Sequence, residues 1–201
     1  WRKKLPLAGQ SIIVTRSRDQ ASKLAEKLEA LGAEVSEFPT IEIAPPKSFR
    51  PLDQAIAGLK LFHYLIFTSR NGVDSFFKRL ALKRKDARNL AHLKVAAIGP
   101  GTTEELSKFG IRPDFQANCD YSQEGLLKEL LRNKVAGKNI LIPRAEQARE
   151  MLASELRRAG AKVNVVSAYR TIKPLVRINP FTQKVDWITF TSSSLFFKCL
   201  V

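Results

Sequence analysis

The sequence has few of the residues that build metal, redox and disulfide sites. Its 201 residues include two cysteines, Cys119 and Cys199, and two histidines, His63 and His92. Neither pair has metal-ligand or redox spacing, so we expect free thiols in a reducing compartment and histidines that take no part in catalysis. We therefore expect no bound metal.

Two further absences narrow the class of protein. The sequence has neither the GxGxxG pattern of dinucleotide sites nor a P-loop, which argues against nucleotide chemistry. No apolar run is long enough to cross a bilayer, and no signal-peptide core follows the N-terminus. We expect a cytoplasmic protein that binds no membrane. Because Met151 is the single methionine, we also expect Trp1 to be a processed end or an internal residue of a longer polypeptide.

Acidic residues are scarce relative to basic ones. The chain has 34 lysines and arginines against 19 aspartates and glutamates, a net charge of +15, so its partner should be an anion. The basic run Lys83-Arg84-Lys85 would suit nucleic acid, but no nucleic-acid-binding motif accompanies it. A solvated loop is the favoured interpretation of that run. A polycarboxylate or phosphate ligand drawn into a cleft explains the charge equally well.

The most informative feature present is an internal repeat. The segment from Ile12 to Val35 recurs without a gap from Ile140 to Val163. The identical positions are Ile12/Ile140, Arg16/Arg144, Leu24/Leu152, Ala25/Ala153, Leu28/Leu156, Gly32/Gly160, Ala33/Ala161 and Val35/Val163. The copies are too far apart for a solenoid, so they indicate two similar domains facing one another across a cleft.

Each copy has the pattern of a β-α-β unit. A short branched apolar run is followed by leucines at helical spacing, and the helical pattern ends at Gly32 or Gly160. A right-handed crossover makes the two strands parallel. Arg16 and Arg144 then fall at the carboxyl end of the first strand, where open α/β sheets bind ligands. The alternative is a solvated arginine at a helix start.

Between the two copies, strands and helices alternate. The pattern predicts strands at 64–67 and 95–98 and helices at 73–80, 103–109 and 126–131. We therefore predict an α/β protein of two similar doubly wound, flavodoxin-like, parallel-sheet domains joined by a two-stranded linker. The expected parts are a first domain of 1–38 plus 176–201, an inserted second domain of 47–167, and proline-closed linkers at 39–46 and 168–175.

Three loops at strand ends carry hydroxyl groups and glycine. They lie at 68–72, 99–103 and 191–194, and each precedes a predicted helix. Free N–H groups at helix N-termini bind carboxylates and phosphates, so these loops are candidate anion sites. Thr102 and Glu105 have capping-box spacing, which would give the Thr102 hydroxyl a capping role instead.

Eight short segments follow one another along the chain: Val14-Thr15-Arg16, Leu31-Gly32-Ala33, Phe38-Pro39-Thr40-Ile41, Phe67-Thr68-Ser69, Ile98-Gly99-Pro100, Pro143-Arg144-Ala145, Ala168-Tyr169-Arg170-Thr171 and Thr189-Phe190-Thr191-Ser192. In this order, and over nearly the whole chain, they resemble the uroporphyrinogen-III synthase family.

The resemblance implies a cofactor-free hydro-lyase of tetrapyrrole synthesis that acts on hydroxymethylbilane, a linear tetrapyrrole with several carboxylates. Its hydroxyl leaves, ring D is attacked at its substituted carbon to give a spiro intermediate, and the ring closes inverted as uroporphyrinogen III. Without the enzyme the substrate closes uninverted, so catalysis means holding the inverting geometry. The resemblance also implies a monomer that binds no nucleic acid.

By the same resemblance, Tyr169 is the group that assists loss of the hydroxyl. A linker tyrosine that packs between domains is the alternative. The residues implied to bind substrate carboxylates are Thr68, Ser69, Asn71, Gly99, Thr102, Tyr121, Ser192, Ser193 and Ser194, with Arg16, Arg144 and Arg149 adding charge.

The resemblance also implies partners and departures. Residues 1–9 are similar to the joint at which this synthase is fused behind a uroporphyrinogen methyltransferase, and hand-over from hydroxymethylbilane synthase is a second expected interaction. The family continues beyond Val201, so we expect an incomplete first domain, and the shortness of 190–200 predicts residues missing after Ser194. The alternative function is a two-lobed binding module for small anions.

Overall fold

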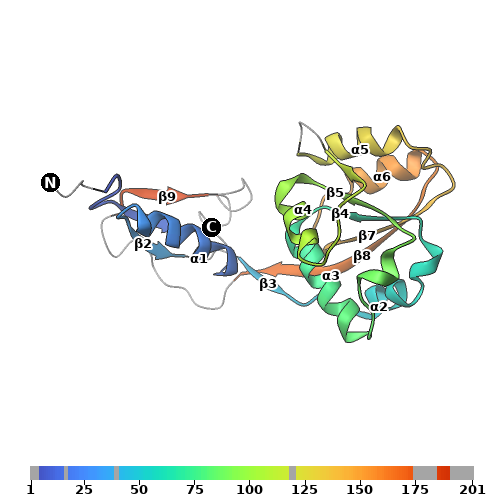
Figure 1. Ribbon diagram of the computed structural model, residues 1–201, viewed down its shortest axis with the longest axis horizontal. Helices are drawn as coiled ribbons and strands as arrows, with labels where there is room; N and C mark the ends of the chain where they lie inside the picture. The colour runs from blue at the N-terminus through green and yellow to red at the C-terminus, as the bar shows by residue number, and fades with distance from the viewer. Residues whose placement is uncertain (1–4, 16–17, 39–40, 118–120, 174–184, 191–201) are drawn as a thin grey trace. The chain divides into compact units, whose positions relative to one another are not determined.

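The computed structural model describes residues 5–15, 18–38, 41–117, 121–173 and 185–190. These residues form two compact units. Unit 1 comprises the described residues up to Ile43 and from Thr171 onward, and unit 2 comprises those of Ala44–Arg170. Among the described residues, unit 1 combines parallel strands with one helix and unit 2 combines parallel strands with several helices (Figure 1). The α/β class with parallel sheets, predicted from the sequence, is confirmed.

Unit 1 contains a three-stranded parallel sheet in the order β2-β1-β9. Its central strand β1 pairs with a strand on each side, and its residues Ile12, Ile13 and Val14 are almost completely buried. Thr15 follows, also buried, and its hydroxyl donates a hydrogen bond of 2.6 Å to the Thr189 carbonyl. The elements of this unit are β1 (Ser11–Val14), α1 (Arg18–Ala30), β2 (Glu34–Glu37) and β9 (Trp187–Thr189).

Unit 2 holds most of a six-stranded sheet in the order β3-β8-β7-β4-β5-β6. The pairs from β8 to β6 are all parallel. The strands are β3 (Glu42–Ala44), β4 (Tyr64–Phe67), β5 (Lys94–Ala97), β6 (Phe115–Gln116), β7 (Asn139–Ala145) and β8 (Lys162–Ile172). The helices are α2 (Arg50–Ala57), α3 (Arg70–Leu82), α4 (Gly99–Ser107), α5 (Gln123–Leu131) and α6 (Met151–Arg158), with 3-10 turns η1 (Leu59–Leu61) and η2 (Ala87–Leu90).

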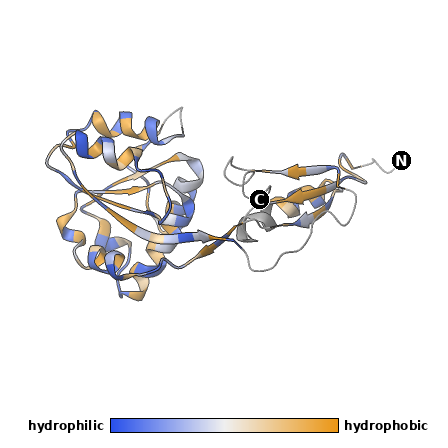
Figure 2. Cartoon of the chain, turned by 180° about the vertical axis from the view of Figure 1, so that it is seen from behind, coloured by the Kyte–Doolittle hydropathy of each residue, from blue (hydrophilic) through white to orange (hydrophobic). Residues whose placement is uncertain are grey.

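Helices cover both faces of this sheet. Figure 1 shows α5 and α6 on one side and α2 and α3 on the other. Ile140 and Ile142 of β7 pack with the leucines of α5 and α6 in one core. On the other face, Phe67 of β4 meets Phe76 of α3 edge-on, with ring centroids 5.4 Å apart. The central strands are mostly hydrophobic, whereas the helices are mixed (Figure 2), as expected for strands buried on both faces.

The repeat seen in the sequence is also a repeat of strand register. The β-α-β unit β1-α1-β2 corresponds to β7-α6-β8, and each first strand pairs on its other side with β9 or β4. The equivalent partners are Ser11/Glu34 and Asn139/Lys162 across one pair of strands, and Ile12/Trp187 and Ile140/Tyr64 across the other. The order β8-β7-β4-β5-β6 is a circular permutation of the flavodoxin order 2-1-3-4-5, in which β7 and β8 take the first two places although they come last in the chain.

Glycines end the repeated helices as the sequence predicts. Gly32 has a φ of 94° and Gly160 a φ of 87°, a left-handed conformation that disfavours other residues. In each copy the residue after the glycine donates its N–H to the carbonyl of an equivalent leucine four residues before the glycine, Leu28 or Leu156. The two helix ends are therefore the same structure built twice.

Three details differ from the sequence-based expectations. The helix α2 was not predicted, although Pro51 in its first turn and buried Leu52 and Ile56 are a helix signature. The short strand β6 was also missed. The helix α4 begins at Gly99, so the capping box predicted for Thr102 is wrong: Thr102 lies inside the first turn, and the helix has no side-chain cap.

No helix among the described residues is long and apolar enough to span a bilayer.

Candidate functional site

The candidate site lies at the carboxyl edge of the unit 2 sheet, where β4 and β7 are neighbours. The helix after β4 is α3 and the helix after β7 is α6, and they lie on opposite faces of the sheet (Figure 1). Open α/β sheets bind ligands outside the strand ends at such a switch point. The polar loops predicted from the sequence follow these strands.

Tyr169 of β8 and Ser69 of the β4–α3 junction meet at this edge. Their hydroxyl oxygens are 3.0 Å apart, although the residues are 100 positions apart in sequence. Tyr169 is buried, with 7% of its surface exposed, and its carbonyl accepts a hydrogen bond from the Glu146 N–H. Burial raises the pKa of the Tyr169 phenol, and the hydrogen bond with Ser69 opposes that shift. Tyr169 is therefore a neutral phenol at physiological pH.

Ser69 is also the N-cap of α3. Its backbone is extended, and its Oγ accepts a hydrogen bond of 3.1 Å from the Gly72 N–H. Gly72 must be small, because a Cβ there would lie 3.1 Å from the Pro143 carbonyl of β7 and 3.2 Å from Ser69 Oγ. The start of α3 is thus held against β7. Thr68 and Asn71, on either side of this cap, are both half-buried.

Arg70 connects the starts of α3 and α4. Its Nε donates to the Gly101 carbonyl at 3.3 Å, and its guanidinium pairs with Glu104 at 3.1 Å. Glu105, which is almost completely buried, lies 3.7 Å from the same guanidinium. Arg70 belongs to the 68–72 loop, but no role was predicted for it from the sequence. The Arg70 guanidinium pairs with acidic residues of α4, and these contacts fix the relative positions of the N-termini of α3 and α4.

The second polar loop places Gly99 beside Tyr121. Gly99 has a φ of 73°, and a Cβ there would lie 3.5 Å from Tyr121 Cβ. Tyr121 is exposed, whereas Thr102 is buried inside α4. The structure therefore brings Gly99 and Tyr121 together in one place and Ser69 and Tyr169 in another along the same edge.

The two predicted arginines at and beyond the end of β7, Arg144 and Arg149, differ in environment. Arg144 is almost completely buried and donates to the carbonyl of Arg149, and its guanidinium forms an ion pair with Glu150. Arg149 is exposed. Arg144 thus closes the loop ahead of α6, and its charge is already neutralised by Glu150. Four other predicted residues, Arg16, Ser192, Ser193 and Ser194, lie outside the described residues.

Glu146 is a second residue to which sequence reasoning gave no role. It follows β7, and its Oε1 lies 3.4 Å from Lys47 Nζ. Its Oε2 is buried and has no hydrogen-bond partner among the described residues. The signal in the sequence was its position directly after the Pro143-Arg144-Ala145 segment.

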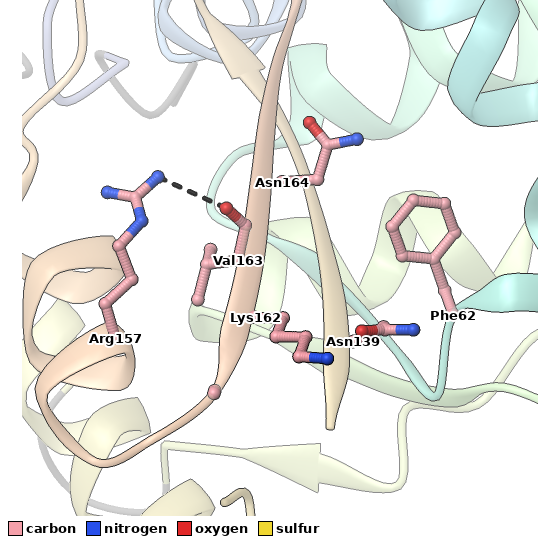
Figure 3. A pocket seen from close by; sticks show the side chains of 7 residues that line it. Phe62, Asn139, Arg157, Lys162, Val163 and Asn164 are labelled. Atoms are coloured by element: carbon pink, nitrogen blue, oxygen red, sulfur yellow. Dashed lines mark hydrogen bonds between the residues drawn. The ribbon is translucent and has the colours of Figure 1, made fainter. Parts of the chain in front are cut away.

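A separate hollow lies at the opposite edge of the sheet. Figure 3 shows it beside the start of β8, with a volume of about 480 Å³. Arg157 and Lys162 supply positive charge, and Arg157 donates to the Val163 carbonyl at 3.3 Å. None of the predicted site residues lines this hollow, so it is not the candidate site.

In the part of the chain that the structure describes, no three histidine, cysteine or acidic side chains form a group that could hold a metal ion.

Comparison with known proteins identifies the family. The family profile described as "Uroporphyrinogen-III synthase HemD" matches residues 22–197. The chain belongs to this family. A uroporphyrinogen-III synthase from Synechococcus elongatus is 38% identical over 84% of this chain and 63% of its own length. The porphyrin biosynthesis protein HemD of Ruminiclostridium josui is 32% identical over 96% of this chain and 39% of its own length.

A solved structure of the family has the same fold. The uroporphyrinogen-III synthetase of Helicobacter pylori superposes with a TM-score of 0.61 at 18% identity, covering 95% of this chain and 77% of that chain. The chain spans less than two thirds of the two synthase-family relatives above.

Proposed function

We propose that this protein is a uroporphyrinogen-III synthase. It would convert hydroxymethylbilane to uroporphyrinogen III by inversion of ring D and loss of water, as a hydro-lyase without a cofactor. The observation that carries the proposal is the family match over residues 22–197. The matched residues include Ser69 and Tyr169, whose hydroxyl groups meet at the carboxyl edge of the sheet. The net charge of +15 suits a substrate with several carboxylates.

In this proposal Tyr169 assists loss of the terminal hydroxyl. A neutral phenol can donate its proton to the oxygen that leaves, and the raised pKa of Tyr169 keeps that proton in place before reaction. The rest of the site holds the bilane so that ring D is attacked at its substituted carbon. Geometry decides between isomers here, because the unassisted reaction closes the same chain without inversion.

Substrate carboxylates would be held by hydroxyl and N–H groups at helix starts. The described candidates are Thr68, Ser69 and Asn71 at α3, Gly99 and Thr102 at α4, and Tyr121. Helix N-termini attract anions without a charged side chain. Arg149 is exposed and can add charge, whereas the Arg144 charge is neutralised by Glu150. Ser192, Ser193, Ser194 and Arg16 remain predicted members of the same set.

The test is an isomer assay. Freshly generated hydroxymethylbilane is added to the protein, the products are oxidised, and the porphyrin isomers are separated. Predominant isomer III is the expected result, whereas isomer I alone, or bilane bound and released unchanged, would contradict the proposal. Turnover also separates a synthase from an anion-binding module.

Tyr169→Phe tests the assigned role. We expect kcat for isomer III to fall about tenfold to a hundredfold, since one general acid is removed while the rest of the site stays. The matched control is Tyr64→Phe, because Tyr64 is a buried tyrosine in the core under α5 and α6. The control should keep its activity. Unchanged turnover in Tyr169→Phe would remove Tyr169 from the mechanism.

The proposal extends to domains and partners. The boundaries are 1–38 with 176–201, 47–167, and linkers at 39–46 and 168–175. We propose a monomer that receives its unstable substrate from hydroxymethylbilane synthase or works beside a fused uroporphyrinogen methyltransferase. Light scattering of the full-length protein, and isomer ratios with and without hydroxymethylbilane synthase at equal bilane flux, would test these points.

A further inference from the structure

Two helix caps in unit 2 have the same local design but different surroundings. Ser69 caps α3 and accepts from the Gly72 N–H at 3.1 Å, while Ser122 caps α5 and accepts from the Gly125 N–H at 3.0 Å. Both are Ser-x-x-Gly sequences with extended backbones. Only Ser69 of the two also has a tyrosine hydroxyl at hydrogen-bond distance, 3.0 Å away. Capping alone therefore does not account for what Ser69 contacts.

The number of donors and acceptors on the Ser69 hydroxyl limits how it can bond to Tyr169. A serine hydroxyl has one proton and two lone pairs, and the Gly72 N–H occupies one lone pair of Ser69. The Ser69 proton then needs an acceptor, and the Tyr169 oxygen is within reach. When Ser69 donates to Tyr169, the phenol proton of Tyr169 is free to be given to another oxygen. The reverse arrangement would commit that proton to Ser69.

We infer that Ser69 is a positioning residue that acts through Tyr169, donating its hydroxyl proton to the phenol oxygen and so aiming the phenol proton at the leaving hydroxyl of the substrate. This inference rests on the proposed function and changes the role of Ser69 from carboxylate binding to support of Tyr169. The chain of hydrogen bonds runs from the Gly72 N–H, at the positive end of α3, through Ser69 to Tyr169.

The proton balance closes over the reaction. The carbon–oxygen bond of the terminal hydroxymethyl group breaks as the Tyr169 proton moves to that oxygen, and water leaves. The phenolate that remains accepts the hydrogen bond from Ser69, and the substituted carbon of ring D captures the carbocation to give the spiro intermediate. The bond from that carbon to the bridge leading to ring C then breaks and leaves a second carbocation on the bridge. The unsubstituted α-carbon of ring D captures this cation and loses its proton, and this proton restores the phenol. Ser69 keeps its own proton throughout, so its contribution is to stabilise the phenolate while it exists.

Burial makes this support necessary. Tyr169 is 7% exposed, so water offers its phenolate little solvation. The hydrogen bond from Ser69 lowers the pKa of Tyr169 against the effect of burial. Removing the Ser69 hydroxyl should therefore raise the pKa of Tyr169 further and make the phenol a poorer acid.

The first experiment is a double-mutant cycle on kcat for isomer III in the full-length protein. We expect Ser69→Ala to lower kcat about tenfold in the wild-type background. In a Tyr169→Phe background the same change should cost less than about twofold, because its target is gone. Equal losses in both backgrounds would overturn the inference and indicate direct contact between Ser69 and substrate.

The matched control is Ser122→Ala. Both serine variants lose a cap to an equivalent glycine N–H, so they should show similar shifts in the urea midpoint. Ser122→Ala should keep its kcat, and Ser69→Thr, which keeps both the cap and the hydroxyl proton, should recover most of the activity. A loss of kcat in Ser122→Ala as large as in Ser69→Ala would assign the effect to helix capping and overturn the inference.

A measurement without substrate separates this inference from the proposed function. Tyrosine ionisation is followed by ultraviolet absorbance during a pH titration, with Tyr169→Phe subtracted to isolate Tyr169. Ser69→Ala should move that titration to higher pH, and Ser122→Ala should leave it in place. An unmoved titration in Ser69→Ala would contradict the link whether or not the protein makes isomer III. Failure of the wild-type isomer assay with a moved titration would contradict only the proposed function.

Discussion

The two copies of the repeat share a backbone but differ at their carboxyl ends. The strand β1 ends at Val14, and Thr15 then turns its hydroxyl back onto the Thr189 carbonyl. Its counterpart β7 continues through Pro143 to Ala145, with Arg144 tied to Glu150 beyond it. Pro143, the counterpart of Thr15, has no hydroxyl group, so the second copy cannot make this hydrogen bond. Apolar and glycine positions common to both copies specify the fold, whereas the ends of the first strands differ.

The largest expected difference between the copies is in their helix packing. Leu156 of α6 is fully buried in the core with α5, whereas its counterpart Leu28 is only half-buried. Leu156→Ala should lower the free energy of unfolding by about 3–4 kcal/mol and Leu28→Ala by about 1–2 kcal/mol. Urea unfolding followed by circular dichroism measures both. Leu82→Ala, at an exposed position of α3, serves as the control and should cost less than about 0.5 kcal/mol. Equal costs for Leu28 and Leu156 would contradict the comparison.

The helix-ending glycines should differ by a smaller amount. Both have positive φ, so either Gly→Ala change costs about 1 kcal/mol from the backbone. A Cβ on Gly32 would lie 2.8 Å from Leu5 Cβ, whereas one on Gly160 would lie 3.4 Å from Ala136 Cβ. Gly32→Ala should therefore cost about 2–3 kcal/mol in the same urea experiment. Gly110→Ala gives the backbone cost alone, because Gly110 has positive φ and open space around it. A smaller loss in Gly32→Ala than in Gly160→Ala would show that the steric argument is wrong.

The stability of unit 2 should depend on pH through the contact of Asp53 with Arg79 and Lys83. Hydrogen bonds from Arg79 and Lys83 lower the pKa of Asp53 from 3.8 to about 2, and they join α2 to α3. A lowered pKa stabilises the folded state above pH 4, and this contribution is lost as the pH falls from about 4 to about 2. Asp53→Asn should be about 1–2 kcal/mol less stable at pH 7, and the gap should close near pH 2.

Urea unfolding at several pH values measures that gap. Asp74→Asn is the control, because Asp74 and Lys78 form an exposed ion pair within α3. Its effect should stay below about 0.5 kcal/mol at every pH. A gap for Asp53→Asn that persists at pH 2 would assign the effect to packing rather than charge.

Local sequence was sufficient to predict the repeat and the ends of its helices, because apolar spacing and a terminal glycine determine structure within one helical turn. It failed at α4, where Gly99-Pro100-Gly101 looks like a loop although Pro100 is acceptable in a first helical turn. Ser69 and Tyr169 could each be named as candidates from the family resemblance. Their contact could not be predicted, since it depends on the sheet order that brings β8 near β4. The ion pair between Arg144 and Glu150 depends on the path of the loop between them. Residue types alone do not specify that path.

The order of elements along the chain has a consequence for synthesis on the ribosome. Unit 2 is continuous from Ala44 to Arg170, but β1 in unit 1 pairs with β9, which comes after all of unit 2. One edge of β1 therefore emerges long before its partner strand exists. An unpaired strand edge can pair with the wrong strand. The run Ile12-Ile13-Val14, which is buried in the folded protein, adds apolar surface that favours aggregation while the edge is unpaired. How quickly unit 2 folds sets how soon β9 can reach that edge, so slow folding of one unit prolongs the exposure of the other.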